Sequence, residues 1–344
     1  LDLSGAEVVA NEYEYYTGYC THDNMLENYA FSALNLRVVH LPKNLIEIHD
    51  CFTSCLYLDT VYCQPGLPTI GKLTFDHCSS LRYVDIKEGL VTIGEKAFSE
   101  TGNLQAITLP NSLETIGSRA FYNTGLLLLT IPANVSSIGD AAFTSNRGEY
   151  NYNNLGSYYY AGGGTLKEVI FAPNSRLTSL PSYAFLGQDD LRTIDWEHTN
   201  IITINLGAIA YCKSIKIPQM PKKLRMIKEY AFDGCSSIDT IHLPSRLETI
   251  EGYAFRDCSN VDVIKISSSV RNINNYAFTG CSNVSRVYTY TVEPTNILQQ
   301  TFSSFSSERR ISSSQEQHRR WYPLPEARCM LYYPLCSYGT SCYI

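Results

Sequence analysis

Apolar positions recur along this chain with a period of 23 residues, and the pattern is clearest in LQAITLPNSLETIGSRAF at residues 104–121. Similar segments occur one or more periods away and end at Phe98, Phe255 and Phe278. Internal repetition of this length is typical of a solenoid, in which short coils stack and bury their apolar edges against one another. A single coil cannot exclude water, so we expect each coil to be stabilised by its neighbours.

The order of apolar and polar residues within one repeat predicts its path. Residues 104–109 have the L-x-x-L-x-L spacing of a short strand with alternate side chains facing inward, and Pro110 ends that strand because it has no N–H to donate. A return path and a corner follow. The residues that this pattern places inside the coil are Leu104, Ile107, Leu109, Leu113, Ile116, Ala120 and Phe121.

The corner residues define about twelve coils in one elongated domain. We predict a leucine-rich-repeat solenoid with a parallel β-sheet on the concave face and short helical or turn corners. The corner residues are Phe31, Phe52, Phe75, Phe98, Phe121, Phe143, Phe185, Ile209, Phe232, Phe255, Phe278 and Phe302. We expect residues 1–28 to form an N-terminal capping coil, 29–305 the solenoid, and 306–344 a polar loop and a C-terminal capping strand.

Two places depart from the regular period. The step from Phe143 to Phe185 is 42 residues, and most of its surplus lies in SNRGEYNYNNLGSYYYAGGG at residues 145–164. A stretch rich in Asn, Gly and Tyr without the repeat pattern indicates a loop inserted into the solenoid. The coil of Ile209 is compressed, so we expect a short strand and a kink in the sheet there.

Glycine recurs at the turn before the corner in four coils, at Gly71, Gly94, Gly117 and Gly139. This recurrence predicts a left-handed backbone conformation at that position, which glycine adopts without steric cost. Later coils have other residues there, namely Lys228, Glu251 and Asn274. The requirement for glycine is therefore either absent or relaxed in the C-terminal half, and the sequence leaves both readings open.

Six of the twelve cysteines occupy one position of the repeat, three residues after the corner: Cys55, Cys78, Cys212, Cys235, Cys258 and Cys281. Other coils have Thr or Gln there, which indicates a small, partly polar packing site, so we expect free buried thiols. Neighbouring parallel coils lie about 4.8 Å apart, a spacing that still allows a disulfide. The sequence leaves open whether Cys329, Cys336 and Cys342 form a disulfide.

Composition and charge narrow the possible functions. The 33 acidic and 27 basic residues give a net charge of -6, which argues against nucleic acid as a partner. No run of 18 or more apolar residues occurs, so we expect membrane association only through an anchor outside this chain. The chain starts with LDL, which looks like the end of a repeat strand, so any signal or anchor is expected upstream. The 26 tyrosines are numerous, and tyrosine suits contact surfaces.

The combination L-x-x-I-x-L-P-x-x-L-x-x-I-G-x-x-A-F-x-x-C resembles the BspA-like leucine-rich repeats, and LPNSLETIGSRAF and EYAFDGCSSIDTIHLP are close to that family's consensus. The resemblance covers residues 29–290. The C-terminal LYYPLCSYGTSCY is also similar to the family's ending, with Cys336 in place of the usual glycine. The resemblance implies a cell-surface or secreted protein of a bacterium or a mucosal protist that binds host proteins or other cells, with no catalytic residue common to the family.

Residues on either side of the middle apolar position of each strand are expected to face outward on the concave sheet. The first outward row is Val38, Thr60, Tyr83, Ala106, Leu128, Thr193, Ser214, Thr240, Val263 and Arg286. The second outward row is His40, Tyr62, Asp85, Thr108, Thr130, Asp195, Lys216, His242, Lys265 and Tyr288. The binding candidates in these rows are Tyr62, Tyr83, Asp85, Asp195, Lys216, His242, Lys265, Arg286 and Tyr288. Cations gather toward the C-terminal end and fit a polar ligand or an acidic partner, although exposed strands also carry charge without any such role.

The inserted loop supplies the other binding candidates, Tyr150, Tyr152, Tyr158, Tyr159 and Tyr160. Tyrosines interleaved with Asn, Ser and Gly have the composition of a binding paratope. The alternative is a solvated insertion whose tyrosines fold back over the flank of the solenoid.

Catalytic and metal sites receive little support. His40, His49, Cys51 and Cys55 are residue types that bind zinc, but the repeat places His40 on a strand and the cysteines at a corner. No nucleophile elbow, P-loop or HExxH motif occurs. We therefore expect no enzyme activity, no metal and no cofactor.

The leading hypothesis is a non-enzymatic recognition or adhesion scaffold that binds host or cell-surface proteins through the concave sheet and the tyrosine-rich loop. A glycan-binding module and a purely structural spacer are the alternatives. Trp196 is a poor candidate for glycan contact because its place in the repeat points inward.

Overall fold

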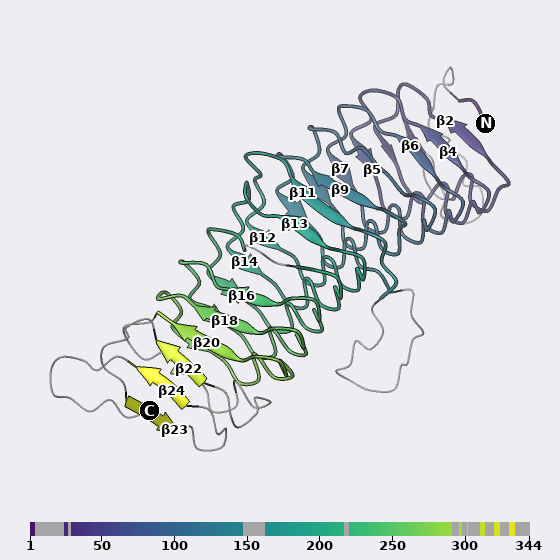
Figure 1. Cartoon of the computed structure of the whole chain (residues 1–344). Helices are drawn as coiled ribbons and strands as arrows, with labels where there is room; N and C mark the ends of the chain where they lie inside the picture. The colour runs from purple at the N-terminus through teal and green to yellow at the C-terminus, as the bar shows by residue number, and fades with distance from the viewer. Residues whose placement is uncertain are drawn as a thin grey trace. The chain divides into compact units, whose positions relative to one another are not determined.

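The structure is a computed structural model that describes residues 1–3, 24–26, 29–146, 162–216, 220–290 and 301, and the backbone of strands β21 to β24. The chain forms a parallel-sheet solenoid of coils of about 23 residues, as the sequence predicts (Figure 1). It divides into two compact units. Unit 1 comprises Leu1–Leu177 and Pro181–Thr199, and unit 2 comprises Thr178–Leu180 and Asn200–Ile344.

The predicted L-x-x-L-x-L strands of unit 1 form two three-stranded parallel sheets. The first sheet contains β2 (Val38–His40), β4 (Thr60–Tyr62) and β6 (Tyr83–Asp85). The second contains β9 (Leu128–Ile131), β11 (Glu168–Phe171) and β13 (Thr193–Asp195). The middle residue of each strand is buried and its neighbours are exposed or half-buried, because side chains alternate along a strand.

The most regular repeat of the sequence lies between these two sheets and forms no strand at residues 105–109. Leu104 is buried, as predicted, whereas Ile107 and Leu109, which the pattern also places inside, are half-buried and alternate with the exposed Ala106 and Thr108. Elsewhere the coils are joined by hydrogen bonds such as Cys63 N–H to the Asp85 carbonyl at 3.1 Å. Leu127 N–H still donates to the carbonyl of Gln105 at 3.0 Å, but residues 106–109 form no strand with a neighbouring coil, and the sheet of unit 1 is interrupted there.

The return path of each coil forms a second parallel sheet that the sequence pattern did not predict. In unit 1 it consists of six two-residue strands in the order β1-β3-β5-β7-β8-β10. They are β1 (Met25–Leu26), β3 (Glu47–Ile48), β5 (Thr69–Ile70), β7 (Thr92–Ile93), β8 (Thr115–Ile116) and β10 (Ser137–Ile138). The corners are turns, and the described residues contain no helical corner, so only the turn half of that prediction holds.

Unit 2 has the same two kinds of sheet. Its six-stranded return sheet contains β12 (Ser179–Leu180), β14 (Thr203–Ile204), β15 (Met226–Ile227), β17 (Thr249–Ile250), β19 (Asn272–Ile273) and β21 (Asn296–Ile297). The other six-stranded sheet contains β16 (Thr240–His242), β18 (Val263–Ile266), β20 (Arg286–Thr289), β22 (Arg310–Ser313), β23 (Arg320–Pro323) and β24 (Met330–Tyr333). The compressed coil at Ser214–Lys216 forms no strand, where the sequence predicted a short one.

The corner phenylalanines point inward and stack in columns. In unit 1 the rings of Phe31, Phe52, Phe75, Phe98, Phe121, Phe143 and Phe185 follow one another with centroids 5.2 to 5.6 Å apart. In unit 2, Phe255 stacks on Phe232 at 5.0 Å and on Phe278 at 5.3 Å. Eleven predicted corners, from Phe31 to Phe278, are described, and Phe302 lies outside the described residues. Because each ring contacts the next, the apolar core is continuous along each unit.

The prediction of left-handed glycines at the turn before the corner is wrong. The left-handed residue comes two positions later in each coil, at Leu73, Lys96, Arg119, Ala141, Tyr230, Tyr253 and Tyr276, with φ between 53° and 62°. Glycine is required at this position because the preceding coil leaves no space for a side chain. A Cβ on Gly117 would lie 2.5 Å from the backbone nitrogen of Glu95 and the carbonyl carbon of Gly94. The backbones of adjacent coils therefore approach too closely in unit 1 for a side chain at this position.

The repeated cysteines form a ladder of buried free thiols, and all eight described cysteines are free. Five thiols donate to the carbonyl oxygen of the corner residue one coil earlier, at 3.0 to 3.2 Å: Cys55 to Phe31, Cys78 to Phe52, Cys235 to Ile209, Cys258 to Phe232 and Cys281 to Phe255. Thr101 and Thr124 at the same position donate to the corner carbonyl of their own coil. The position thus accepts a small donor side chain, as expected.

The first residues pair with the strand at the start of unit 1. The N–H of Leu3 donates to the carbonyl of His40 at 2.9 Å, and the N–H of His40 donates to the carbonyl of Leu1 at 3.0 Å. These bonds occupy one edge of β2. Near the end of the predicted capping coil, Met25 and Leu26 form β1, which pairs with β3. The remainder of that coil, like most of the predicted C-terminal cap, lies outside the described residues.

Candidate functional site

The outward rows predicted from the sequence are exposed or half-buried at every position. Strand pairing keeps them aligned, since Tyr62 pairs with His40 and Asp85, and Lys265 pairs with His242 and Tyr288. The outward faces of these sheets are therefore available for contact.

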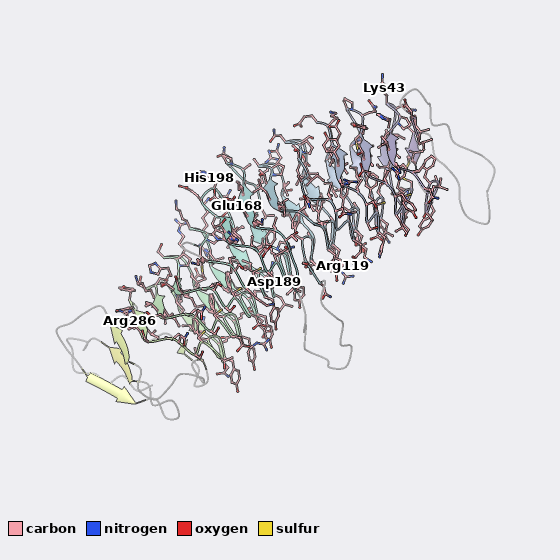
Figure 2. The ribbon with its side chains drawn as sticks, turned by 45° about the vertical axis from the view of Figure 1, so that its right-hand side comes forward. Lys43, Arg119, Glu168, Asp189, His198 and Arg286 are labelled. Atoms are coloured by element: carbon pink, nitrogen blue, oxygen red, sulfur yellow. The ribbon has the colours of Figure 1, made fainter. Side chains whose placement is uncertain are left out.

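The rows include one further coil, which the prediction from the sequence omits. Glu168 and Ile170 of β11 pair with Leu128 and Thr130 of β9, so they extend the first and second rows. In Figure 2 Glu168 and Arg119, a corner residue, mark opposite sides of unit 1. The signal was present in the sequence, because LKEVIF at residues 166–171 has the L-x-x-L-x-L spacing directly after the inserted loop.

An aromatic cluster covers the first sheet of unit 1. The rings of His40 and Tyr62 stack at 4.5 Å, and Tyr62 meets Tyr83 edge to face at 6.1 Å. Asp85 lies beside Tyr62 in the second row and forms an ion pair of 2.7 Å with Lys87. This cluster offers apolar ring surface together with hydroxyl and imidazole groups, a composition that favours contact with a protein or a glycan.

The charged residues in the outward rows of unit 1 are acidic. Asp85, Glu168 and Asp195 are the carboxylates, and the described outward positions of unit 1 contain no Lys or Arg. Glu168 and Asp195 are exposed, and Asp195 accepts a hydrogen bond from the N–H of Glu197 at 2.9 Å. Trp196 is buried and stacks on Phe171 at 6.0 Å, so the prediction that it points inward is confirmed.

The rows of unit 2 have the opposite sign. Lys216, His242, Lys265 and Arg286 are their charged or titratable residues, and their described positions contain no carboxylate. Arg286 pairs with Asp262 of the preceding coil at 3.0 Å, and that carboxylate raises the pKa of the guanidinium. Burial, together with the charge of Lys265, lowers the pKa of His242. The neutral form of the imidazole therefore predominates at pH 7.

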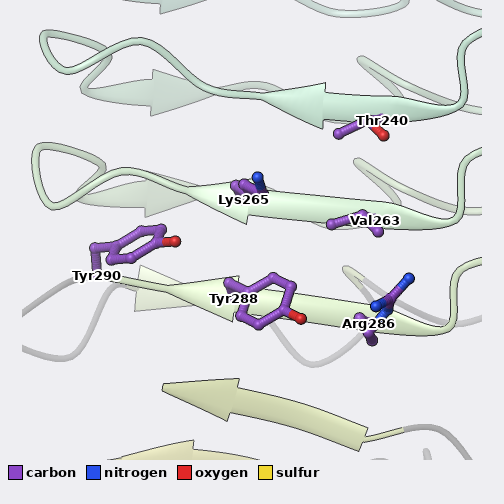
Figure 3. Close-up of a pocket in the computed structure, with 6 residues that line it drawn as sticks. All are labelled: Thr240, Val263, Lys265, Arg286, Tyr288 and Tyr290. Atoms are coloured by element: carbon purple, nitrogen blue, oxygen red, sulfur yellow. The ribbon is translucent and has the colours of Figure 1, made fainter. Parts of the chain in front are cut away.

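A shallow depression of about 310 Å³ lies on this part of unit 2 (Figure 3). It is lined by Thr240, Val263, Lys265, Arg286, Tyr288 and Tyr290. Four of these residues come from the adjacent strands β18 and β20, and Tyr290 follows β20. Sequence reasoning missed Tyr290, which lies one residue beyond the last strand position of its coil. The depression therefore combines ring surface, hydroxyl groups and two cations.

The five candidate tyrosines of the inserted loop, Tyr150 to Tyr160, lie outside the described residues. The two ends of the insertion are described and meet each other. Asn146 forms a parallel bridge with Gly162, and the Ser145 hydroxyl donates to the Gly162 carbonyl at 3.2 Å. Because its ends are adjacent, the insertion can be shortened without separating the coils on either side.

A polar network lies at a corner of unit 2. Arg256 forms a bidentate pair with the buried Asp233, with distances of 2.5 and 2.8 Å, and donates to the Tyr211 hydroxyl at 3.2 Å. The guanidinium also lies 5.0 Å from the ring of Tyr230, which stacks on Tyr253 at 5.0 Å. Burial raises the pKa of the Asp233 carboxyl although Arg256 opposes the shift. This network ties neighbouring coils together.

Among the described residues no group of three or more His, Cys, Asp and Glu side chains is placed to hold a metal ion. His40 lies on β2 whereas Cys51 and Cys55 are buried at a corner. Burial, with the nearby Asp85 carboxylate, raises the pKa of the Cys63 thiol to about 12.

The described part of the chain has no helix with the length and apolar character that crossing a membrane requires.

Comparisons with known proteins agree with this architecture. The family model described as the BspA type leucine rich repeat region (6 copies) matches residues 24–149, 148–261 and 202–316. No curated protein matches the chain.

Among solved structures, a leucine-rich repeat protein from Bacteroides ovatus is 20% identical with a TM-score of 0.57, and the alignment covers 89% of this chain and 70% of that one. The pneumococcal vaccine antigen PcpA is 15% identical with a TM-score of 0.48, covering 86% of this chain and 79% of that one. The likeness to the Bacteroides ovatus protein concerns the fold alone.

Proposed function

The chain belongs to the family of proteins with BspA type leucine rich repeats, and we propose that it is a non-enzymatic recognition scaffold that binds a protein partner through the outward rows of its sheets. The observation that carries this proposal is the exposure of those rows in coil after coil. A repeat scaffold builds a wide surface from one simple unit, and only the outward side chains need to differ between coils.

The side chains in the rows support a protein partner. Tyr62 and Tyr83 supply large, amphipathic rings, and the sheets also present carboxylates and cations at fixed spacing. Interfaces between proteins are enriched in such aromatic residues, and opposite charges give them specificity. The tyrosine-rich insertion has the composition of a second contact surface.

The place of action that we propose is a cell surface or the extracellular space. This part of the proposal follows the resemblance to the family. We propose host matrix or cell-surface proteins as partners. A glycan is the second candidate, because the half-exposed ring of Tyr83 offers an aromatic surface of the kind that sugars stack on.

The test measures binding of the chain to immobilised extracellular-matrix proteins and to a glycan panel. One variant combines Tyr62→Ala with Tyr83→Ala, and the matched control is Arg119→Ala at a corner. A second variant replaces residues 147–161 by two glycines, since Asn146 and Gly162 already meet. We expect binding to a protein that falls in the double variant and persists in the control.

Binding to glycans alone would favour the second candidate. Binding to neither panel would reject recognition and leave a structural spacer. If shortening the insertion abolishes binding while the double variant still binds, the contact surface is the inserted loop and not the sheet.

A further inference from the structure

We propose that the depression on β18 and β20 binds an acidic peptide segment of the protein partner, with one carboxylate placed against Lys265. This inference rests on the proposed function and names the chemistry of its partner. The depression lies within the outward rows of unit 2, whose described positions contain cations and no carboxylate.

The charges at the depression leave one cation to be matched. Arg286 already forms an ion pair of 3.0 Å with Asp262. The pKa of His242, which pairs with Lys265 on the neighbouring strand, is lowered, so its neutral form predominates at pH 7. No ion pair within 4 Å joins Lys265 to another described residue. One unmatched ammonium group favours one carboxylate, whereas a highly sulfated glycan needs several free cations in a row.

The shape and the other lining groups fit an amino-acid side chain. A depression of about 310 Å³ is of the size that takes one or two side chains, not an extended polymer. Val263 supplies an apolar wall on β18, and Tyr288 and Tyr290 supply ring surface for the aliphatic part of a Glu or Asp (Figure 3). Their hydroxyl groups donate hydrogen bonds to a carboxylate, which strengthens its pairing with Lys265.

The position in the sheet also suits a peptide. Lys265 pairs with Tyr288, and Val263 pairs with Arg286, on strands about 4.8 Å apart. A peptide lying across the strands therefore meets Thr240, Val263 and Arg286 in one row and His242, Lys265 and Tyr288 in the other. Of these three second-row residues Lys265 is the cation, and no ion pair joins it to another described residue, so it sets the register of the acidic residue.

The experiment uses the full chain and a biotinylated, C-terminally amidated peptide of alternating Glu and Gly, read by biolayer interferometry. The same peptide with Gln in place of Glu, 3′-sialyllactose and heparin are the other probes. The variants are Lys265→Glu, the milder Lys265→Gln and Tyr288→Phe. The matched control is Lys222→Glu, which changes an exposed lysine outside the two rows. Circular dichroism melting verifies the fold of each variant.

We expect the Glu peptide to bind, and Lys265→Glu to weaken it about tenfold, because the reversed charge repels the carboxylate. Lys265→Gln and Tyr288→Phe weaken it less, Lys222→Glu leaves it within about twofold, and the Gln peptide binds about tenfold more weakly. Salt weakens binding because the site is exposed.

Equal affinity of folded Lys265 variants and the control would overturn the proposal, as would binding of sialyllactose or heparin in place of the Glu peptide. Failure of the inference is distinguishable from failure of the proposed function. If matrix proteins bind and depend on Tyr62 and Tyr83 while the Glu peptide does not bind, the inference falls and the recognition function stands. If neither binds, both are rejected.

Discussion

The thiol of Cys258 donates a hydrogen bond of 3.1 Å to the carbonyl oxygen of Phe232, one coil earlier. The same bond recurs at four other cysteines, so this repeat position links five coils to the coil before each of them. The position needs a donor that reaches a corner carbonyl: Thr101 and Thr124 donate to the corner carbonyl of their own coil, and the amide of Gln188 donates to that of Phe143 in the preceding coil.

This relationship predicts how Cys258 tolerates substitution. Cys258→Thr keeps a donor of similar size and should cost less than about 1 kcal/mol of unfolding free energy, while Cys258→Leu should cost about 1–3 kcal/mol through overpacking of a fully buried site. Urea unfolding followed by circular dichroism measures both. Asn260→Ala, at an exposed neighbouring turn, is the control. A Leu variant as stable as the Thr variant would contradict the tight packing of this position.

Substitutions at Gly117 and Arg119, two positions apart in one coil, should change the stability of unit 1 in opposite directions. Gly117→Ala should destabilise unit 1 by about 1–3 kcal/mol, because the new Cβ would lie 2.5 Å from backbone atoms of the preceding coil. Arg119→Gly should stabilise it by about 0.5 kcal/mol, because glycine relieves the left-handed φ of 54°. Thermal melting measures both changes. Arg119→Ala is the matched control and should be close to neutral, since alanine keeps the strain.

Removing Arg256 should leave a buried carboxylate without its cation. We expect Arg256→Ala to cost about 3 kcal/mol at pH 7, because the Asp233 side chain is only 3% exposed. Arg246→Ala, which changes an exposed arginine, should have little effect.

The cost of Arg256→Ala should depend on pH in a defined direction. Burial raises the pKa of Asp233 above its unfolded value, and loss of Arg256 raises it further. The penalty of the charged carboxylate is therefore present at neutral pH and disappears as pH falls toward about 4, where the unfolded carboxylate also takes up a proton. Urea unfolding at several pH values tests this. A difference from the wild type that stays constant with pH would place the loss in packing alone.

The pKa of the His242 imidazole should respond to the charge of Lys265, its neighbour in the sheet. Burial and, second, the charge of Lys265 lower its pKa. Lys265→Ala removes the repulsion, so the pKa of His242 should rise toward its ordinary value. NMR titration of the imidazole resonances measures the change, and Lys222→Ala should leave it unaltered. A pKa that did not move would show that the two side chains do not interact across β16 and β18.

The sequence by itself determined the repeat, the inward column of corner phenylalanines, the small buried cysteine position and the outward rows. Each of these depends on the pattern within one coil, and that pattern is copied with its period of 23 residues, so one repeat predicts the others. The strand that contains Glu168 could also be predicted from the sequence, because its apolar residues have the regular spacing; only the insertion before it obscured the alignment.

The tertiary structure decided what depends on the distance between coils. Whether Gly117 serves conformation or close approach, whether residues 105–109 pair as a strand, and whether the return path forms a sheet all follow from how closely one backbone lies against the next. The partnership of Arg256 with Asp233, and the placement of Lys265 between His242 and Tyr288, likewise arise only when coils stack in register. A sequence pattern specifies which side of a coil a residue occupies. Packing against the neighbouring coil determines the charge partners of its side chain and the space available to it.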